Sequence, residues 1–194
     1  MTKPRWTRIL AVLVACGLPA ARPCAVLAQD ATVVILVRHA ERAPEPRSDP
    51  VLSAEGTARA QALAVALADT RLDGIVTTQL QRTRLTAEPI IAARGITPDV
   101  VNTAGGTATH VQAVASHVRT RYTGKTVLVV GHSNTIPPII TALGGPRLAD
   151  LCDTEFAHLY VLVLRADGTA SLVDGSFGTP DAPTAADCRH TMPR

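Results

Sequence analysis

The chain has 194 residues, which suits one domain with a full sheet core, and its formal net charge is +3. Residues 1–28 hold four basic residues and no acid, so the rest of the chain has a formal charge of about −1. Lys125 is the only lysine after that segment, and aromatic residues make up 3% of the chain. This composition argues against a nucleic-acid-binding protein, which needs a basic face and stacking side chains.

The first 28 residues are typical of a secretory leader. Three basic residues precede an apolar stretch over residues 9–21, and Ala28 ends a Val-Leu-Ala sequence of the kind that signal peptidase cleaves. The apolar stretch is shorter than the ~20 residues that a membrane span needs. We therefore expect cleavage after Ala28, a single domain over residues 29–194, and a periplasmic or secreted protein without a membrane span.

The four cysteines give two predictions that depend on this processing. Residues 13–16 read Leu-Val-Ala-Cys, which resembles a lipobox, so a lipid anchor on Cys16 is an alternative to cleavage after Ala28. Cleavage after Ala28 leaves Cys152 and Cys188. An even pair in an exported chain predicts one disulfide between them, with two buried thiols as the alternative.

Predicted strands and helices alternate along the rest of the chain. Residues 33–37 are all apolar, which is typical of a strand covered on both faces. A proline-rich loop over residues 43–50 follows, and a helix begins after Ser53 as its N-cap. Pro89 predicts a kink or a second start in the next helix. The other predicted strands are residues 74–78, 96–101, 126–130, 158–164 and 170–173, and the other predicted helices are residues 79–94, 107–122 and a last one with Pro137 in its first turn.

This alternation predicts an α/β fold, namely a three-layer α/β/α sandwich with a mostly parallel sheet. An Asp-Gly pair at residues 167–168 separates the last two strands and favours a hairpin turn. We expect that hairpin to form an antiparallel edge of the sheet.

Charged side chains follow three of the predicted strands. Arg38, His39 and Arg42 follow the first, Arg82 follows the second, and His132 follows the strand over residues 126–130. The carboxyl ends of parallel strands meet at one edge of a sheet, where ligands bind. Guanidinium and imidazole groups can hold a phosphoryl group and attack it. The sequence therefore predicts a phosphate pocket at this edge.

These residues lie in segments that resemble the successive motifs of the histidine phosphatase superfamily, also called phosphoglycerate mutase-like. The resemblance implies that His39 is a nucleophile that forms a phosphohistidine, that Arg38 and Arg82 bind phosphoryl oxygens, and that His132 completes the pocket. It implies no cofactor and no metal. The segments are Leu-Val-Arg-His-Ala-Glu at residues 36–41, Leu-Ser-Ala-Glu-Gly at 52–56, Thr-Gln-Leu-Gln-Arg-Thr-Arg-Leu-Thr-Ala at 78–87 and Val-Gly-His-Ser at 130–133.

Residues 38–44 are also similar to the Arg-His-Gly-x-Arg-x-Pro form of the acid phosphatase branch, with Ala40 in place of glycine. This similarity adds Arg42 as a third substrate-binding residue.

The proton donor for the leaving group departs from the family pattern. The smaller members of the superfamily often have a glutamate acid about 25 residues after the second motif arginine, which is Arg82 in this chain. Here residues 89–149 contain one acid, Asp99. The acid phosphatase branch has an aspartate after the second histidine, where this chain has Ser133. A substrate with a good leaving group, such as phosphohistidine, needs little acid help. The candidate acids are, in order, Glu155, Asp153, Glu41 and His110.

Together these features predict an exported, metal-independent phosphomonoesterase that acts on a small phosphorylated substrate through His39. A phosphohistidine or phosphoprotein phosphatase and a mutase-like phosphotransferase remain alternatives. A non-catalytic phosphate-binding protein is the alternative of another class, and the presence of both His39 and His132 disfavours it.

Overall fold

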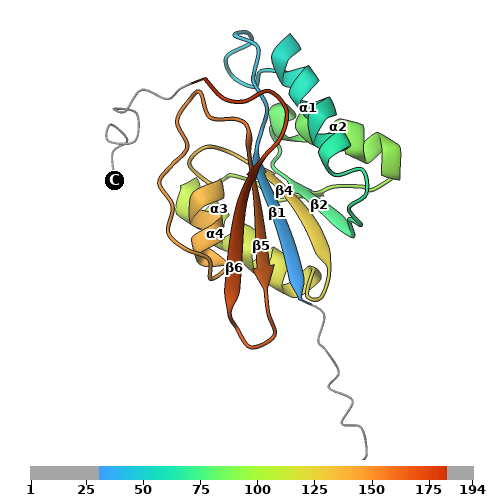
Figure 1. Ribbon diagram of the computed structural model, residues 1–194. Coiled ribbons are helices and arrows are strands. Elements are labelled where there is room, and N and C mark those ends of the chain that lie inside the picture. Colours follow the sequence, from blue (N-terminus) through green and yellow to red (C-terminus); the bar gives the residue numbers. More distant parts are fainter. Residues whose placement is uncertain (1–30, 183–194) are drawn as a thin grey trace, which may run out of the picture.

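The computed structural model describes residues 31–182, shown in colour in Figure 1. The predicted leader, the alternative anchor at Cys16 and the cysteine at position 188 lie outside the described residues. The disulfide between Cys152 and Cys188 therefore stays a prediction. None of the helices within the described range is both long and apolar enough to cross a membrane.

Six strands form one sheet, in the order β3-β2-β4-β1-β5-β6. Neighbouring strands from β3 to β1 are parallel, whereas β5 runs antiparallel to both β1 and β6. The predicted α/β fold is therefore confirmed, with a mixed sheet whose last two strands form an antiparallel hairpin. The strands are β1 (Thr32–Arg38), β2 (Gly74–Thr77), β3 (Asp99–Val100), β4 (Thr126–Gly131), β5 (His158–Leu164) and β6 (Ala170–Ser176).

Helices cover both faces of this sheet, as Figure 1 shows. Helices α1 and α2 pack on each other and on one face, and α3 and α4 pack together on the other. Alternate residues of β1 explain the two cores, since Val34 and Leu36 join the cluster with α3 and α4 while Ile35 and Val37 join the cluster with α1 and α2. The helices are α1 (Ala54–Ala66), α2 (Gln81–Arg94), α3 (Gly106–Arg121) and α4 (Ile136–Ala142).

Two local predictions need correction. The strand expected over residues 96–101 is reduced to β3, because Pro98 has no N–H to donate to a sheet and the segment lies at an edge. Helix α2 continues through Pro89 and does not start again there. Burial of Thr86, Ala87 and Ile90 stabilises the helix there and offsets the cost of the backbone hydrogen bond that Pro89 cannot make.

Candidate active site

The parallel pairing of β1 with β4 places two histidines side by side. Arg38, the last residue of β1, is in register with Gly131, the last residue of β4. His39 and His132 follow directly, and the backbone N–H of His39 donates to the carbonyl of Gly131 at 2.9 Å. The two imidazole rings lie 5.3 Å apart between centroids, with an interplanar angle of 64°. The strand ends therefore converge as the sequence predicted.

His39 is held in one orientation with one nitrogen free. Its Nδ1 lies 2.8 Å from the carbonyl oxygen of Ala40, and because a carbonyl only accepts, Nδ1 carries the proton and Nε2 keeps its lone pair. The N–H of Ala40 is fixed in turn by Oγ1 of Thr86 at 2.9 Å. Burial, followed by the nearby positive groups, lowers the pKa of His39 to about 3. The imidazole is neutral at physiological pH, as a nucleophile must be.

The turn before β5 fixes the guanidinium of Arg38. Its Nη1 donates to the carbonyl oxygens of Cys152 at 2.7 Å and Glu155 at 2.8 Å. The guanidinium carbon also lies 3.9 Å from the ring centroid of Phe156, which is a cation-π contact. Burial is the main cause that lowers the pKa of Arg38 to about 10, so the group stays cationic at neutral pH.

Glycine at position 131 allows the second histidine to sit at the start of α4. A Cβ there would lie 2.8 Å from Cδ1 of Ile136 and 3.0 Å from Oγ1 of Thr135, closer than carbon atoms normally approach. Burial, and then the charge of Arg82, lowers the pKa of His132 to about 4. Its Nε2 lies 3.4 Å from Oγ1 of Thr78, at the end of β2. Three neighbouring strands thus contribute to one pocket.

Two further arginines border this pocket. Arg82 lies in the first turn of α2, with its side chain 15% exposed, and its Nη1 is 3.9 Å from Oδ1 of Asp49. Arg42 is exposed and follows β1 in a loop that bridges to Leu52. The positive charge of Arg42 contributes to lowering the pKa of both Arg38 and Arg82, which reflects their closeness. The three predicted arginines therefore lie together.

A cavity of about 340 Å³ brings all five predicted phosphate-site residues together. Several other lining residues were not predicted from the sequence. One of them, Asn134, is only two residues after His132, so its position in the sequence could have identified it. The lining residues are Arg38, His39, Arg42, Leu80, Arg82, Thr103, Gly106, Thr107, His110, His132, Ser133, Asn134, Thr135 and Asp153.

Three side chains that line this cavity carry buried nitrogens without hydrogen-bond partners in the described part of the chain. Four buried side-chain polar atoms lack a hydrogen-bond partner within residues 31–182, and three of them are Nε of Arg38, Nε of Arg82 and Nδ1 of His132. Buried polar groups normally have partners. An anion with several acceptor oxygens, such as a phosphoryl group, supplies them. No group of three or more His, Cys, Asp or Glu side chains in the same range could hold a metal ion.

Comparisons with known proteins agree with this geometry. A family model described as histidine phosphatase superfamily (branch 1) matches residues 34–104. The structure of the protein histidine phosphatase SixA with tungstate gives a TM-score of 0.58 at 15% identity, covering 74% of this chain and 96% of that one. A protein from Agrobacterium tumefaciens assigned as the phosphohistidine phosphatase SixA is 28% identical, with a TM-score of 0.54 and coverages of 77% and 99%. A mycobacterial glucosyl-3-phosphoglycerate phosphatase is 17% identical, with a TM-score of 0.59, and the match covers 75% of this chain and 98% of that one. A comparison with curated proteins found no match.

The matched segment and these solved structures make the histidine phosphatase superfamily the family that the chain resembles, and they support a phosphatase. The matched segment contains four of the five predicted site residues, and His132 joins them from β4, outside that segment. Parallel pairing of β4 with β1 explains how His132 reaches the pocket from outside the matched segment.

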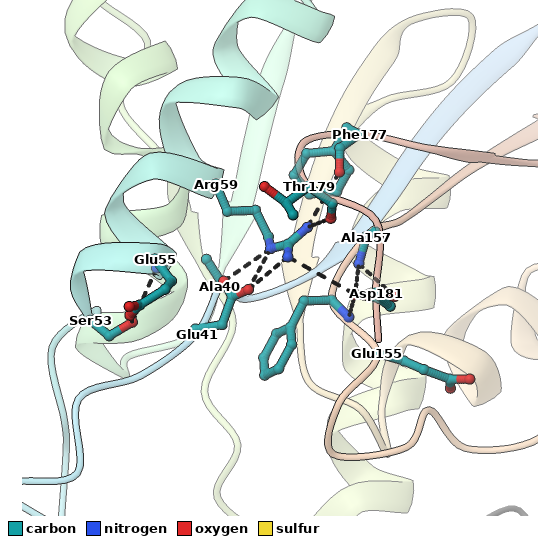
Figure 2. A network of polar contacts seen from close by, with 12 residues as sticks. Ala40, Glu41, Ser53, Glu55, Arg59, Glu155, Ala157, Phe177, Thr179 and Asp181 are labelled. Atoms are coloured by element: carbon teal, nitrogen blue, oxygen red, sulfur yellow. Dashed lines mark hydrogen bonds and ion pairs between the residues drawn. The ribbon is translucent and has the colours of Figure 1, made fainter. Parts of the chain in front are cut away.

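The four acid candidates are placed very differently in the structure. Glu155, the first candidate, is buried, and one of its carboxylate oxygens accepts from the N–H of Cys152 at 2.8 Å instead of lining the cavity. In Figure 2 its side chain points away from Glu41, and Glu41 is paired with Arg59. Asp153 and His110 do line the cavity. By position, Asp153 and His110 can reach a bound substrate, whereas Glu155 and Glu41 do not line the cavity.

A buried arginine that sequence reasoning missed ties the site loop to the end of the described chain. Nε and Nη2 of Arg59 contact the carboxylate of Glu41 at 2.7 to 2.9 Å, and Nη1 donates to the carbonyl of Thr179 at 2.9 Å (Figure 2). The carboxylate of Asp181 accepts from the backbone N–H of Phe156, the residue whose ring contacts Arg38. This network supports the turn that orients Arg38.

Close packing brings this network to the site. Residue 56 in α1 is a glycine because a Cβ there would lie 2.0 Å from the carbonyl oxygen of Glu41. That approach lets the backbone N–H of Ser53 donate to the same carbonyl at 3.0 Å, while the Ser53 side chain caps α1. The Leu-Ser-Ala-Glu-Gly segment at residues 52–56 therefore docks α1 against the loop that follows His39.

Proposed function

We propose that this protein is an exported, metal-independent phosphomonoesterase that forms a phosphohistidine on His39. The observation that carries the proposal is the set of buried donors on Arg38, Arg82 and His132 without a partner in the described chain. Those donors surround a neutral imidazole in one cavity, which is the arrangement that phosphoryl transfer requires.

The chemistry proceeds in two displacements. Nε2 of His39 attacks phosphorus, the nitrogen–phosphorus bond forms, and the ester oxygen leaves with its electron pair and takes up a proton. A water molecule then attacks the phosphohistidine, and inorganic phosphate leaves as His39 returns to its neutral form. Arg38, Arg82 and the hydrogen-bond donor of His132 stabilise the charge on the phosphoryl oxygens in both steps.

Trapping the phosphoenzyme tests this proposal. The protein is mixed with radiolabelled 4-nitrophenyl phosphate and quenched in alkali, where a phosphohistidine survives. We expect label on the peptide that contains His39, no label in His39→Asn, and wild-type labelling in His158→Asn, a control at a histidine on β5 that does not line the cavity. Hydrolysis without any trapped label, or equal labelling of His39→Asn, would contradict the proposal.

A phosphohistidine substrate is a second candidate function. The supporting observations are a relative assigned as a phosphohistidine phosphatase at 28% identity and a cavity whose lining residues include one carboxylate, Asp153. A nitrogen–phosphorus bond breaks with little acid help. A higher kcat/KM for a phosphohistidine peptide than for phosphoserine peptides would favour this candidate, and the reverse order would exclude it.

Export and the disulfide complete the proposal. The supporting observations are the leader-like residues 1–28 and the two cysteines that follow them. Intact mass and N-terminal sequencing of protein recovered from a periplasmic fraction test both points. We expect a chain that begins at Gln29 and lacks the two thiol hydrogens of Cys152 and Cys188. A chain that begins at a lipidated Cys16 would support the anchor instead.

A further inference from the structure

His110 lies in the cavity with one nitrogen committed and the other available. It is in the second turn of α3, is 2% exposed and lines the cavity beside His132. Its Nδ1 lies 3.1 Å from the carbonyl oxygen of Asn102, and because that oxygen only accepts, Nδ1 carries a proton there. The hydrogen bond through Nδ1 is the one that the His110 side chain makes among residues 31–182, so Nε2 makes none there. The ring is therefore fixed so that Nε2 is the nitrogen that exchanges a proton.

The electrostatics place His110 close to the reacting groups. Its charge is among the causes that lower the pKa of His132, after burial and Arg82. The ring of His132 is in turn 5.3 Å from the ring of His39. His110 therefore lines the same cavity as the nucleophile and lies close to His132. In an in-line displacement the leaving group departs on the side opposite the nucleophile, and His110 acts on that side in the role proposed below.

The other acid candidates lack this combination of position and orientation. Glu41 is paired with Arg59, and the carboxylate of Glu155 accepts a backbone N–H outside the cavity lining. Asp153 lines the cavity, but its side chain is 93% exposed, and its ion pair with Arg38 is long, at 3.9 Å. A proton donor in catalysis needs a fixed position within hydrogen-bond reach of the reacting atom.

We propose that His110 is a catalytic residue that protonates the leaving group, a role that rests on the phosphatase function proposed above. In the first step His110 acts as the imidazolium, with a proton on each nitrogen, and the Nε2 proton passes to the ester oxygen as the oxygen–phosphorus bond breaks and the bond from His39 to phosphorus forms. The Nδ1 proton of His110 stays on the ring and remains hydrogen-bonded to the carbonyl oxygen of Asn102. In the second step Nε2 takes a proton from the attacking water, which restores His110.

This assignment specifies a substrate class. An aliphatic alkoxide is a poor leaving group, so hydrolysis of an alkyl phosphate depends on the proton donor, whereas a dinitrophenolate leaves without one. A site with His110 in this role is suited to phosphate esters of ordinary alcohols as well as to activated phosphates. A site without a proton donor would hydrolyse only activated phosphates at a useful rate.

Leaving-group dependence tests the proposal. His110→Asn keeps a side-chain donor for the Asn102 carbonyl and removes the exchangeable nitrogen. With glycerol phosphate we expect kcat/KM to fall by ~10² to 10³, and with 2,4-dinitrophenyl phosphate we expect a change of less than about threefold. The matched control is His117→Asn, seven residues along the same helix and outside the cavity, which keeps wild-type rates with both substrates.

Two outcomes overturn the proposal while leaving the phosphatase function intact: equal losses with both substrates, or no loss with either. Failure of the phosphatase function is distinguishable, because wild-type protein then forms no phosphoenzyme from 2,4-dinitrophenyl phosphate. If His110→Asn does not fold, His110→Ala with added imidazole replaces it. Imidazole is expected to restore hydrolysis of glycerol phosphate alone, and the absence of such rescue contradicts the proposal.

Discussion

The cavity has an inner part and a rim that are built in different ways. The inner part consists of Arg38, His39 and His132, which are 6%, 6% and 8% exposed and stand at the ends of β1 and β4. The rim includes Arg42 and Asp153, which are exposed on loops. Backbone pairing fixes the first group, whereas solvent surrounds the second. Under the proposed function we therefore expect the inner part to determine whether phosphoryl transfer occurs and the rim to adjust how tightly an anion is held.

Burial also changes the chemistry of the inner part. Desolvation is the largest cause that brings the pKa of His39 to about 3, that of His132 to about 4 and that of Arg38 to about 10. A cationic guanidinium next to two neutral imidazoles is a stable combination over a wide pH range. The difference between inner part and rim thus predicts unequal effects of similar substitutions.

Arg38→Ala is expected to give the largest effect. The substitution removes a buried cation that faces the phosphoryl group and is already oriented by the carbonyls of Cys152 and Glu155. Loss of one preorganised donor typically reduces turnover by ~10² to 10³, about 3 to 4 kcal/mol. Steady-state kinetics with 4-nitrophenyl phosphate, together with a melting curve that shows a folded variant, measure it. A folded variant with wild-type kcat/KM would remove Arg38 from the site.

The inner part is also the part that the sequence predicts well. An uninterrupted apolar run at residues 33–37 identifies a buried strand, and charged residues directly after such strands must meet at one sheet edge because parallel pairing aligns their ends. Arg38, His39, Arg42, Arg82 and His132 were found for that reason, and all line the cavity. The α/β layering follows from the same alternation of strands and helices.

Contacts that use backbone atoms or distant segments could not be predicted in the same way. The carbonyls that hold Arg38 belong to a turn more than 110 residues away and carry no side-chain signature. Arg59 lies within a helix pattern, and its partners stand 18 residues before it and 120 residues after it. Glu155 was ranked first among the acid candidates, whereas a local turn directs its carboxylate to the backbone N–H of Cys152.

Arg59→Met is expected to give the next largest effect, on stability. It leaves Glu41, whose side chain is 22% exposed, without its buried partner and removes the contact to Thr179. Removing one member of a buried pair lowers the free energy of unfolding by about 3 kcal/mol. The control is Arg84→Met, which breaks an exposed i,i+4 pair with Glu88 and should lower it by about 0.5 kcal/mol or less. Equal midpoints of urea unfolding for the two variants would contradict the role of Arg59.

Acid pH should destabilise the protein through its inner histidines. The folded pKa of His39, about 3, lies below its ordinary 6.5, so the unfolded chain binds more protons between these values. This contribution to stability is complete above pH 6.5 and is lost as the pH falls toward 3. From pH 7 to pH 5 the loss is about 2 kcal/mol for His39. Unfolding of wild type and His39→Gln at several pH values should show a shallower acid slope in the variant, and parallel slopes would contradict this prediction.

The smallest effect is expected at the rim, from Arg42→Ala. Arg42 lines the cavity on the same loop that follows His39, but water screens its exposed guanidinium, so its contact with a phosphate contributes about 1 kcal/mol. We therefore expect inhibition by vanadate to weaken roughly fivefold, with kcat little changed, and the loss to shrink as salt is added. The matched control is Arg47→Ala, an exposed arginine of the same loop that pairs with Glu45 and does not line this cavity, and it should leave inhibition unchanged. If Arg42→Ala instead lowered kcat as far as Arg38→Ala does, the rim would take part in the chemistry, and the division between a catalytic inner part and a rim that tunes affinity would be wrong.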